Sequence, residues 1–329
     1  HGDDWYQGTA DAVRRNMIHF HAKPQDVFVI LSGDQLYRMD FTKMVEEHLE
    51  RGADVTVAAK PVPLSEASGL GLLRVGENAK IVDFVEKPTD PEVISRLVPP
   101  ELKSADGMED RCLASMGIYV FTATAMEDAL KGDATDFGKE IIPSLVEKKD
   151  IRCHIFDDYW EDIGTVKAFF DANLQLTDEV PAFDFYEGER PIYNRPDILP
   201  TAKLGKCLVT RTIIASGSMI GESTLNRCVL GERSMVGDGC NLESVVMVGA
   251  DFYEDHADPN IPELGVGQGA QIQDAIIDKN ARIGKNVFLS PKGLEEGWAD
   301  AGENVYIRDG ILIVTKNGVV ADGVHIGNP

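Results

Sequence analysis

Two aspartates, each placed directly after a strand-like run, are the first residues of this sequence that could do chemistry. Asp34 follows the apolar run of "VFVILSGDQLY", and Asp162 follows "IRCHIF" within the segment "DDYWEDIGT". Ligands of open α/β sheets bind beyond the carboxyl ends of the strands, where we expect both side chains. Mg²⁺ favours one or two carboxylates completed by water and substrate phosphates. Taken together, the two aspartates favour a magnesium site.

Each aspartate also has a simpler interpretation. Asp34 could cap the turn after its strand by bonding to nearby backbone. Asp162 could join Thr165 in a capping network at the start of the helix expected in "TVKAFFDANLQL". Taken alone, either residue fits capping as well as it fits metal binding, so the metal site depends on the pair.

A lysine that could meet a phosphate ends another strand-like run, "FVEKPTD". Lys87 follows Glu86 and precedes Pro88, whose fixed φ angle holds the turn. An ammonium group in such a turn can meet a phosphate as a point charge. A solvated surface position is the commoner role of a lysine, and both interpretations stay open.

The segment "WYQGTADAV" places Gly8 and Thr9 at an expected helix start. Unpaired N–H groups at a helix start favour anions. Trp5 and Tyr6 precede them and could stack on a base or contact a sugar. A capped helix start is the simpler interpretation of this segment.

Composition and charge limit the class of protein. The chain has 329 residues, of which 43% are hydrophobic, so it can form two domains with separate cores. Its 55 acidic and 32 basic residues give a net charge of −23, which disfavours nucleic acid and anionic membranes as partners. No apolar run reaches the length of about eighteen residues that a membrane helix needs. With no signal-peptide pattern at the start, we expect a cytoplasmic protein.

The cysteines are scattered and include no CxxC pair, so neither a disulfide framework nor a zinc site is expected. We expect reduced, structural thiols. The five positions are Cys112, Cys153, Cys207, Cys228 and Cys240.

From Gly8 to about Leu176, strand-like and helix-like segments alternate. A helical stripe of Val13, Met17 and Phe20 precedes the run 27–31, which predicts a strand buried on both faces. Gly52 should close a helix, and residues 71–88 should form a hairpin that turns at 76–78. The order predicts a mostly parallel α/β sandwich with an inserted hairpin. The other expected strands are 54–60 and 115–121, and the other helices are 41–51, 137–148 and 165–176.

After the proline-rich segment "DFYEGERPIYNRPDILPTA", apolar residues recur every six positions, and glycine follows several of them. A six-residue period is typical of a parallel β-helix, in which each coil stacks its apolar residues on the next. The recurring apolar residues are Leu230, Val236, Leu242, Val248, Val266, Ile272, Ile277, Ile283 and Leu289. The glycines are Gly221, Gly231, Gly237, Gly249, Gly267 and Gly284.

Six motifs occur in order before this repeat: "WYQGTADAV", "LSGDQLYRMD", "FVEKPTDP", "ASMGIYVF", "DFGKEIIP" and "YWEDIGT". With the β-helix pattern, they resemble the glucose-1-phosphate adenylyltransferases, also called ADP-glucose pyrophosphorylases. The "GTADA" form is the most discriminating. The resemblance implies an α/β nucleotidyltransferase domain, Rossmann-like, mostly parallel and incomplete at its N-terminus, then a left-handed parallel β-helix. We expect the catalytic domain in 1–180, a linker in 181–200 and the β-helix in 201–329.

The resemblance implies a reaction of ATP with α-D-glucose 1-phosphate that gives ADP-glucose and diphosphate, with Mg²⁺ as cofactor, in glycogen or starch synthesis. By motif, Asp34 and Asp162 would bind the metal and take part in catalysis, and Lys87 would bind the sugar phosphate. The positions that would line the sugar pocket are Tyr6, Gly71, Glu86, Ser115, Asp136, Phe137 and Trp160. The positions on the nucleotide side are Trp5, Gly8 and Thr9.

The C-terminal stretches "SPKGLEEGWAD" and "IRDGILIVTKNGVVADG" resemble those that bind an activating anion in this family. Lys292 and Lys316 match the lysines that bind 3-phosphoglycerate there, although solvated surface lysines explain them equally well. Other family members respond to fructose 1,6-bisphosphate. The resemblance also implies a homotetramer.

One departure concerns the start of the chain. The family's glycine-rich GGxGxRLxPLT loop does not occur here, and the sequence begins at His1 without methionine. We expect a fragment of a longer gene that is inactive alone; the alternative is a protein that cannot catalyse the reaction.

Three rival functions follow from these residues. A non-catalytic regulatory subunit would be marked by lost metal carboxylates, but Asp34 and Asp162 are present. A sugar nucleotidyltransferase for another base is the second. An acyltransferase acting through its β-helix would need a catalytic histidine between coils, and His256 and His325 are the candidates.

Overall fold

The computed structural model describes residues 5–103, 109–194, 198–254 and 260–329. The chain forms two compact units. Unit 1 comprises residues 1–33 and 37–160, and unit 2 comprises residues 34–36 and 161–329. The chain therefore passes between the units on both sides of Asp34 and again just before Asp162.

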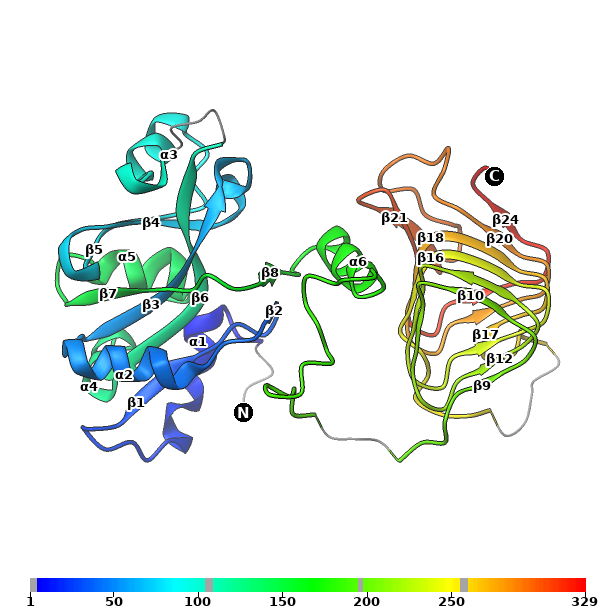
Figure 1. Cartoon of the computed structure of the whole chain (residues 1–329), viewed down its shortest axis with the longest axis horizontal. Helices are drawn as coiled ribbons and strands as arrows, with labels where there is room; N and C mark the ends of the chain where they lie inside the picture. The colour runs from blue at the N-terminus through cyan, green and yellow to red at the C-terminus, as the bar shows by residue number, and fades with distance from the viewer. Residues whose placement is uncertain (1–4, 104–108, 195–197, 255–259) are drawn as a thin grey trace. The chain divides into compact units, whose positions relative to one another are not determined.

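Unit 1 is built around a mixed sheet in which β6 is central. β6 pairs antiparallel with β1, β3 and β4, β3 pairs parallel with β7, and β4 pairs antiparallel with β5. Within the described residues, four strands thus run in one direction and two in the other, which fits the expected α/β class. The strands are β1 (Val27–Ile30), β3 (Val55–Pro63), β4 (Gly71–Val75), β5 (Ile81–Glu86), β6 (Arg111–Thr122) and β7 (Ile151–Ile155). Figure 1 shows β3, β6 and β7 side by side.

The prediction that the first strand is buried on both faces is wrong. β1 is half-buried, and Val29 and the following Leu31 are 37% and 47% exposed. Of the strands described, only β6 pairs with β1, so β1 lies at an edge of the sheet. An apolar run alone cannot distinguish a central strand from an edge strand.

The helices of unit 1 begin and end largely where sequence signals predict. α1 continues into the 3₁₀ turn η1, so that Val13 and Met17 pack on the core as expected. Phe20 does not share this burial; it is 52% exposed and lies edge-on to Phe28. Gly52, with φ of 60°, closes α2 as predicted. The helices are α1 (Thr9–Asn16), η1 (Met17–His19), α2 (Phe41–Arg51), α3 (Pro91–Leu97), α4 (Ala123–Ala129), the π-helix η5 (Phe137–Ile141) and α5 (Ile142–Leu145), with short 3₁₀ turns η2 (Leu64–Gly69), η3 (Glu77–Ala79) and η4 (Pro100–Leu102).

Unit 2 is a parallel β-helix preceded by helix α6 (Val166–Gln175). Successive coils stack strand upon parallel strand in three rows, as Figure 1 shows for β16 and β18. One row is β9 (Lys203–Leu204), β12 (Met219–Ile220), β15 (Met235–Val236), β17 (Gly265–Val266), β19 (Arg282–Ile283) and β23 (Val319–Val320). The second is β10 (Leu208–Thr210), β13 (Thr224–Asn226), β16 (Asn241–Met247), β18 (Gln271–Ile277), β20 (Phe288–Leu289) and β24 (His325–Ile326). β11 (Ile213–Ile214) and β14 (Val229–Leu230) lead the third row, which continues in the second halves of β16 and β18 and ends in β22 (Ile311–Val314). An antiparallel strand, β21 (Val305–Arg308), pairs with β22.

The six-residue pattern identifies the β-helix interior with one exception. Leu230, Leu242 and the other recurring residues are buried, but Val248 is only half-buried. Met247 takes the inward place because it pairs with Leu230 and Ile277 in the neighbouring coils. This coil is one residue shorter than three hexapeptides, so the strict period moves out of register there.

Glycine at the coil corners lets one coil approach the next closely. A Cβ atom on Gly237 would lie 2.7 Å from the backbone nitrogen of Gln268, and one on Gly267 would lie 2.7 Å from the carbonyl carbon of Gly284. These distances are too short for any side chain, and the obstructing atoms are backbone. The predicted glycine column is therefore a packing requirement of the β-helix.

The outer surface of the β-helix carries α6. Phe170 and Leu174 of α6 pack against Val246, Ile276 and Ile313, which point outward from β16, β18 and β22. Thr165 caps the helix as predicted, since its Oγ1 accepts the Ala168 N–H at 3.1 Å. Between α6 and β9 the described residues form neither helix nor strand.

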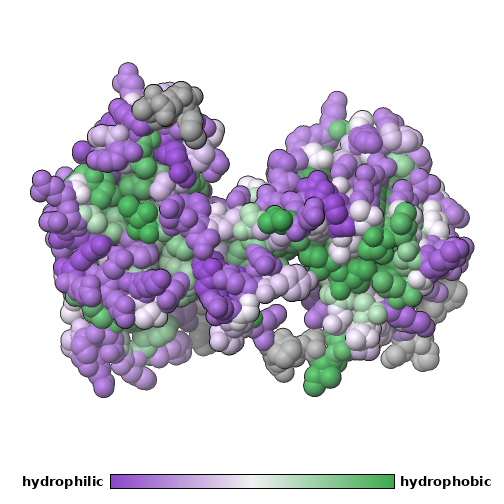
Figure 2. All heavy atoms as spheres, in the orientation of Figure 1, coloured by the Kyte–Doolittle hydropathy of each residue, from purple (hydrophilic) through white to green (hydrophobic). Residues whose placement is uncertain are grey.

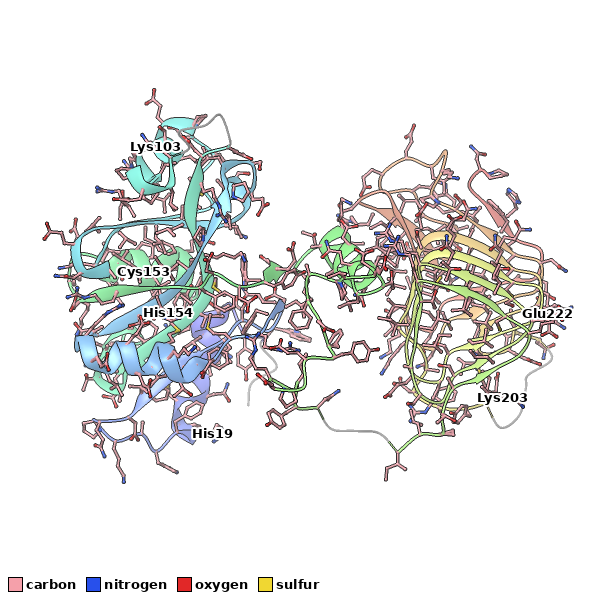
Figure 3. All side chains as sticks on the ribbon, in the orientation of Figure 1. His19, Lys103, Cys153, His154, Lys203 and Glu222 are labelled. Atoms are coloured by element: carbon pink, nitrogen blue, oxygen red, sulfur yellow. The ribbon has the colours of Figure 1, made fainter. Side chains whose placement is uncertain are left out.

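The thiols and the surface agree with the composition. All five cysteines are free, as expected, and burial raises the pKa of Cys153, labelled in Figure 3, to about 12.

Hydrophilic residues cover most of the visible surface of each unit in Figure 2, and a hydrophobic area lies on the β-helix around β10, where Leu208 is exposed. Among the helices of the described part of the chain, none has the length and hydropathy needed to span a bilayer.

We expect Gly237→Ala to lower the free energy of unfolding by about 1–3 kcal/mol, because the new methyl group would force adjacent coils apart. Denaturant unfolding checks this. Gly188→Ala is the control, since its Cβ would meet no atom within 4 Å. Equal stability of the two variants would contradict the packing role.

Candidate active site

Asp34 and Asp162, which the sequence predicts to act as a pair, lie near each other in the structure. β2 (Gln35–Tyr37) and β8 (Trp160–Asp162) form a two-stranded sheet. Next to it, the Ile163 N–H donates to the Asp34 carbonyl at 3.0 Å. A Cβ atom built on Gly164 would lie 3.0 Å from Asp162 Oδ1 and 3.4 Å from Asp34 Oδ2. Two carboxylates from distant parts of the chain thus flank one glycine.

The local turn orients the Asp162 carboxylate. Its Oδ1 accepts the Gly164 N–H at 3.0 Å, so Asp162 closes a tight turn, while Thr165 is the residue that caps α6 from within the same segment. The capping interpretation is therefore correct for Thr165. Capping does not explain why Asp34 reaches the same glycine.

This pair suits Mg²⁺ better than a metal that needs a complete protein cage. Within the described residues, no group of three or more His, Cys, Asp or Glu side chains gathers as a metal site. Mg²⁺ retains several waters and is typically held by one or two carboxylates together with substrate phosphates. Asp34 and Asp162 could provide this donor set.

A second acidic cluster lies in unit 1, around Glu86. A Cβ on Gly71 would collide with Glu86 Oε2, and one on Gly138 would lie 3.1 Å from the same oxygen. Asp136 lies beside Gly138 and accepts the Lys139 N–H at 2.8 Å. The two glycines leave room for carboxylate oxygens, which are suitable acceptors for sugar hydroxyls.

Burial and charge control the protonation of this cluster. Desolvation raises the pKa of Glu86; the positive charge of Lys87 opposes the shift, and Asp136 adds to it. Burial also raises the pKa of the Tyr119 phenol far above its ordinary value, while a hydrogen bond with Ser115 opposes this shift. Glu86 therefore holds a proton more readily than an exposed glutamate does.

Aromatic rings pack next to the cluster around Glu86 and Asp136. Phe137 is buried against Tyr119 and Phe121, with ring centroids 5.8 Å and 5.7 Å away. Sequence reasoning singled out Ser115 and Phe137 but missed Tyr119. Its alternation with Phe121 in "GIYVF" places both on one face of β6 and could have indicated it.

The start of α1 is closed by the chain itself. The Thr135 carbonyl accepts the N–H groups of Ala10 and Asp11 at 2.8 Å and 3.3 Å, so the capped interpretation is correct for these donors. A Cβ on Gly8 would collide with the same carbonyl, which explains the glycine. Thr9 Oγ1 donates to Asp136 Oδ2 at 3.4 Å, so the "GTADA" segment is joined to the cluster around Glu86 and Asp136.

The remaining unit 1 candidates, Trp5, Tyr6 and Trp160, differ in exposure. Trp5 and Tyr6 are exposed, and the Tyr6 hydroxyl accepts a hydrogen bond from Asn16. Trp160 is buried among core residues such as Met44 and Met116, so its side chain is part of the core.

Lys87 is held by its backbone. It adopts a left-handed φ of 45°, and its N–H donates to the Leu70 carbonyl at 3.1 Å. A left-handed conformation is unfavourable for a residue with a Cβ and occurs often at functional sites. Lys87 lies in unit 1 and the aspartate pair in unit 2, so its approach to that pair stays a prediction.

The two expected effector lysines lie on different corners of the β-helix. Lys292 follows β20 and donates to Gln273 Oε1 at 3.2 Å. Lys316 follows β22 and occupies the same place as Lys279 on the preceding coil, because Ile277 pairs with Val314. Sequence reasoning missed Lys279, although the parallel segments "IIDK" and "IVTK" could have indicated it.

These stacked lysines share one carboxylate. Lys279 Nζ lies 2.7 Å from Asp251 Oδ1. Hydrogen bonds from Lys279 and Asn280 lower the pKa of Asp251, and the charge of Lys316 lowers it further. Two ammonium groups on adjacent coils thus lie near one carboxylate at this corner of the β-helix.

The histidines needed for the acyltransferase alternative receive no support. His325 lies on β24 with its ring stacked on Phe288, 4.4 Å between centroids. His256 falls outside the described residues.

Comparisons with known proteins match both units. Residues 2–179 match the family model described as nucleotidyl transferase, and residues 197–324 match the GLGC left-handed parallel beta-helix domain. A similar protein from Zea mays is the glucose-1-phosphate adenylyltransferase large subunit 1, chloroplastic/amyloplastic. The two are 40% identical over 338 residues, which cover 97% of this chain and 65% of that protein. The resemblance inferred from the six motifs and the expected fold are thus confirmed.

We expect Glu86→Gln to raise the melting temperature at pH 8 and to change it less at pH 5. The raised pKa means that the ionised carboxylate is costly in the folded state at high pH, a cost that falls as the pH approaches the ordinary value of 4.5.

Glu140→Gln is the matched control for this experiment. Hydrogen bonds from Thr135 lower the pKa of Glu140, so this substitution should reduce stability at pH 8. Thermal unfolding of both variants at the two pH values is the measurement. A gain for Glu86→Gln that is larger at pH 5 would contradict the assignment.

Proposed function

We propose, from the premise that the chain belongs to the nucleotidyl transferase family, that the protein transfers an adenylyl group from ATP to α-D-glucose 1-phosphate. The products would be ADP-glucose and diphosphate, in glycogen or starch synthesis. The observation that carries the proposal is the meeting of Asp34 and Asp162 at Gly164, which offers the donor set that a nucleotide-bound Mg²⁺ requires.

Asp34 and Asp162 would hold the metal, which when bound would neutralise phosphate charge. The turn that joins Asp162 to Gly164 fixes one carboxylate before substrate binds, so less ordering is needed on binding. Lys87 would bind the phosphate of the sugar from its constrained turn. With reactants aligned, positioning and charge stabilisation would provide most of the acceleration.

The cluster around Glu86 and Asp136 would recognise the sugar. Carboxylate oxygens accept hydrogen bonds from hydroxyls, and the packed rings of Phe137 and Tyr119 would exclude water on one side. Tyr6 would contribute a further sugar contact, and Trp5, Gly8 and Thr9 would lie toward the nucleotide.

An alternative is a regulatory subunit with weak or no catalysis, since the maize relative is named a large subunit. The aspartate pair favours catalysis, because a subunit that only regulates has no need to bring two carboxylates to one glycine. A related enzyme for another nucleotide is a further alternative. We also propose a cytoplasmic location and a homotetramer, whereas the maize relative is named as chloroplastic/amyloplastic.

We further propose that an anionic effector, 3-phosphoglycerate or fructose 1,6-bisphosphate, binds the β-helix. Lys316 and its stacked neighbour Lys279 offer two ammonium groups on one corner. Lys292, on another corner, is the separate candidate.

Asp34→Asn and Asp162→Asn in the full-length protein should each lower kcat by about a hundredfold or more, because each loses a charge that holds the metal. The melting temperature should stay close to that of the wild type. Activity is measured with ATP, UTP, GTP and dTTP, each with glucose 1-phosphate.

Asp171→Asn, an exposed carboxylate on α6 paired with Lys167, is the control and should retain activity. Wild-type turnover in both aspartate variants would refute the metal role. A preference for a nucleotide other than ATP would refute the substrate, and a wild-type protein without turnover would favour the regulatory subunit.

Lys316→Ala should raise the effector concentration for half-maximal activation by about tenfold, because a phosphate loses one of its charged partners. Lys279→Ala should act similarly. Activation curves with each of the two effectors provide the measurement. The opposite result, with Lys292→Ala impaired and Lys316→Ala normal, would move the site to the other corner.

A further inference from the structure

The helix that follows the aspartate pair is held by the β-helix. Only Ile163, Gly164 and Thr165 separate Asp162 from α6. The apolar side of α6 rests on the outer face of the third strand row, and its first turn meets the hairpin that β21 forms with β22. The residues in this packing are Val166, Phe169, Phe170, Leu174, Val246, Ile276, Tyr306, Ile311 and Ile313.

A single carboxylate joins that hairpin to the start of α6. Asp309 lies in the turn between β21 and β22, where its Oδ2 accepts the Lys167 N–H at 3.3 Å. The first N–H groups of a helix have no partner within the helix, and a negative charge there is favourable. Asp309 also has a left-handed φ of 55°, a conformation that aspartate tolerates better than most residues.

The segment from α6 back to the aspartates is fixed at each residue. Thr165 caps the helix, the Gly164 N–H donates to Asp162, and the Ile163 N–H donates to the Asp34 carbonyl. With so few rotatable residues, a displacement of the first turn of α6 would be passed to both carboxylates.

The strands that support α6 also lead to the lysine corner. Ile276 of β18 packs with α6, and Lys279 follows β18. Ile313 of β22 also packs with α6, and Lys316 follows β22. Helix α6 and the lysine corner are thus supported by the same pair of adjacent strands, β18 and β22.

We propose that Asp309 is a positioning residue, which holds the first turn of α6 on the β-helix and thereby sets Asp162 and Asp34 for metal and phosphate. The catalytic part of this inference rests on the proposed function. Asp309 acts through the backbone of α6, so it should affect turnover more than substrate affinity.

Asp309→Gly tests the contact, because glycine adopts the left-handed backbone readily and removes only the carboxylate. Hydrogen exchange of the Ile163 and Lys167 amides should become faster by about tenfold, since both report local opening. In the full-length protein kcat should fall by about tenfold, with KM for glucose 1-phosphate within about twofold. Asp309→Asn keeps an acceptor oxygen, so its amide exchange and its kcat should lie between those of Asp309→Gly and the wild type.

Glu303→Gly is the matched control. Glu303 lies in the turn before β21, is exposed and has a φ of 53°, so its replacement changes charge and backbone in the same way. Both exchange and kcat should match the wild type in this variant.

The outcomes separate the two proposals. Unchanged amide exchange in Asp309→Gly, or faster exchange with unchanged kcat, would overturn the positioning role. The same losses in Glu303→Gly would also overturn it. Absence of adenylyl transfer in the wild type would overturn the proposed function, and the exchange rates alone would then decide whether Asp309 holds α6.

Discussion

The structure depends on holding two like charges at one point. Asp34 and Asp162 flank Gly164, and two ionised carboxylates brought near one another repel unless a cation offsets their charge. Backbone hydrogen bonds oppose this repulsion: Ile163 holds the Asp34 segment, and Gly164 holds the Asp162 side chain. Glycine at the centre keeps this space open, because a Cβ there would lie 3.0 Å from Asp162 Oδ1 and 3.4 Å from Asp34 Oδ2. A cation bound by both carboxylates would offset their mutual repulsion.

Such a site needs a rigid support, and the β-helix can provide one. Its coils are joined strand to strand, and its corner glycines let backbones approach to distances that no side chain permits. A close-packed scaffold of this kind transmits displacements because its interior cannot absorb them. Because α6 rests on β18 and β22, its position depends on two strands that are each followed by a lysine, Lys279 and Lys316. An anion at that corner would therefore act on the strands that hold the aspartate segment.

Features set by adjacent residues, such as helix ends, could be predicted from the sequence. Features set by residues far along the chain, such as strand burial and coil register, could be predicted only in part. Gly52 and Thr165 ended and began their helices where expected, because capping depends on a few adjacent residues. The six motifs indicated the family, which the comparisons confirm. The burial of β1 was overestimated because an apolar run does not reveal how many strands pair with it. Val248 was misassigned because one short coil shifts the period, and Lys279 was missed because its partner on the next coil is far along the chain.

The two acidic sites differ in environment, and the difference suits different ligands. Asp34 is exposed, whereas Glu86 is partly buried, and desolvation raises the pKa of Glu86. An exposed carboxylate can bind a hydrated cation, while a desolvated carboxyl is better suited to neutral hydroxyls, since a hydrogen bond is stronger where water is excluded. A chain with a net charge of −23 repels anionic substrates in general, so it must bind them locally. Asp34 and Glu86 thus present carboxyl groups in two different environments, one suited to a hydrated cation and the other to hydroxyl groups.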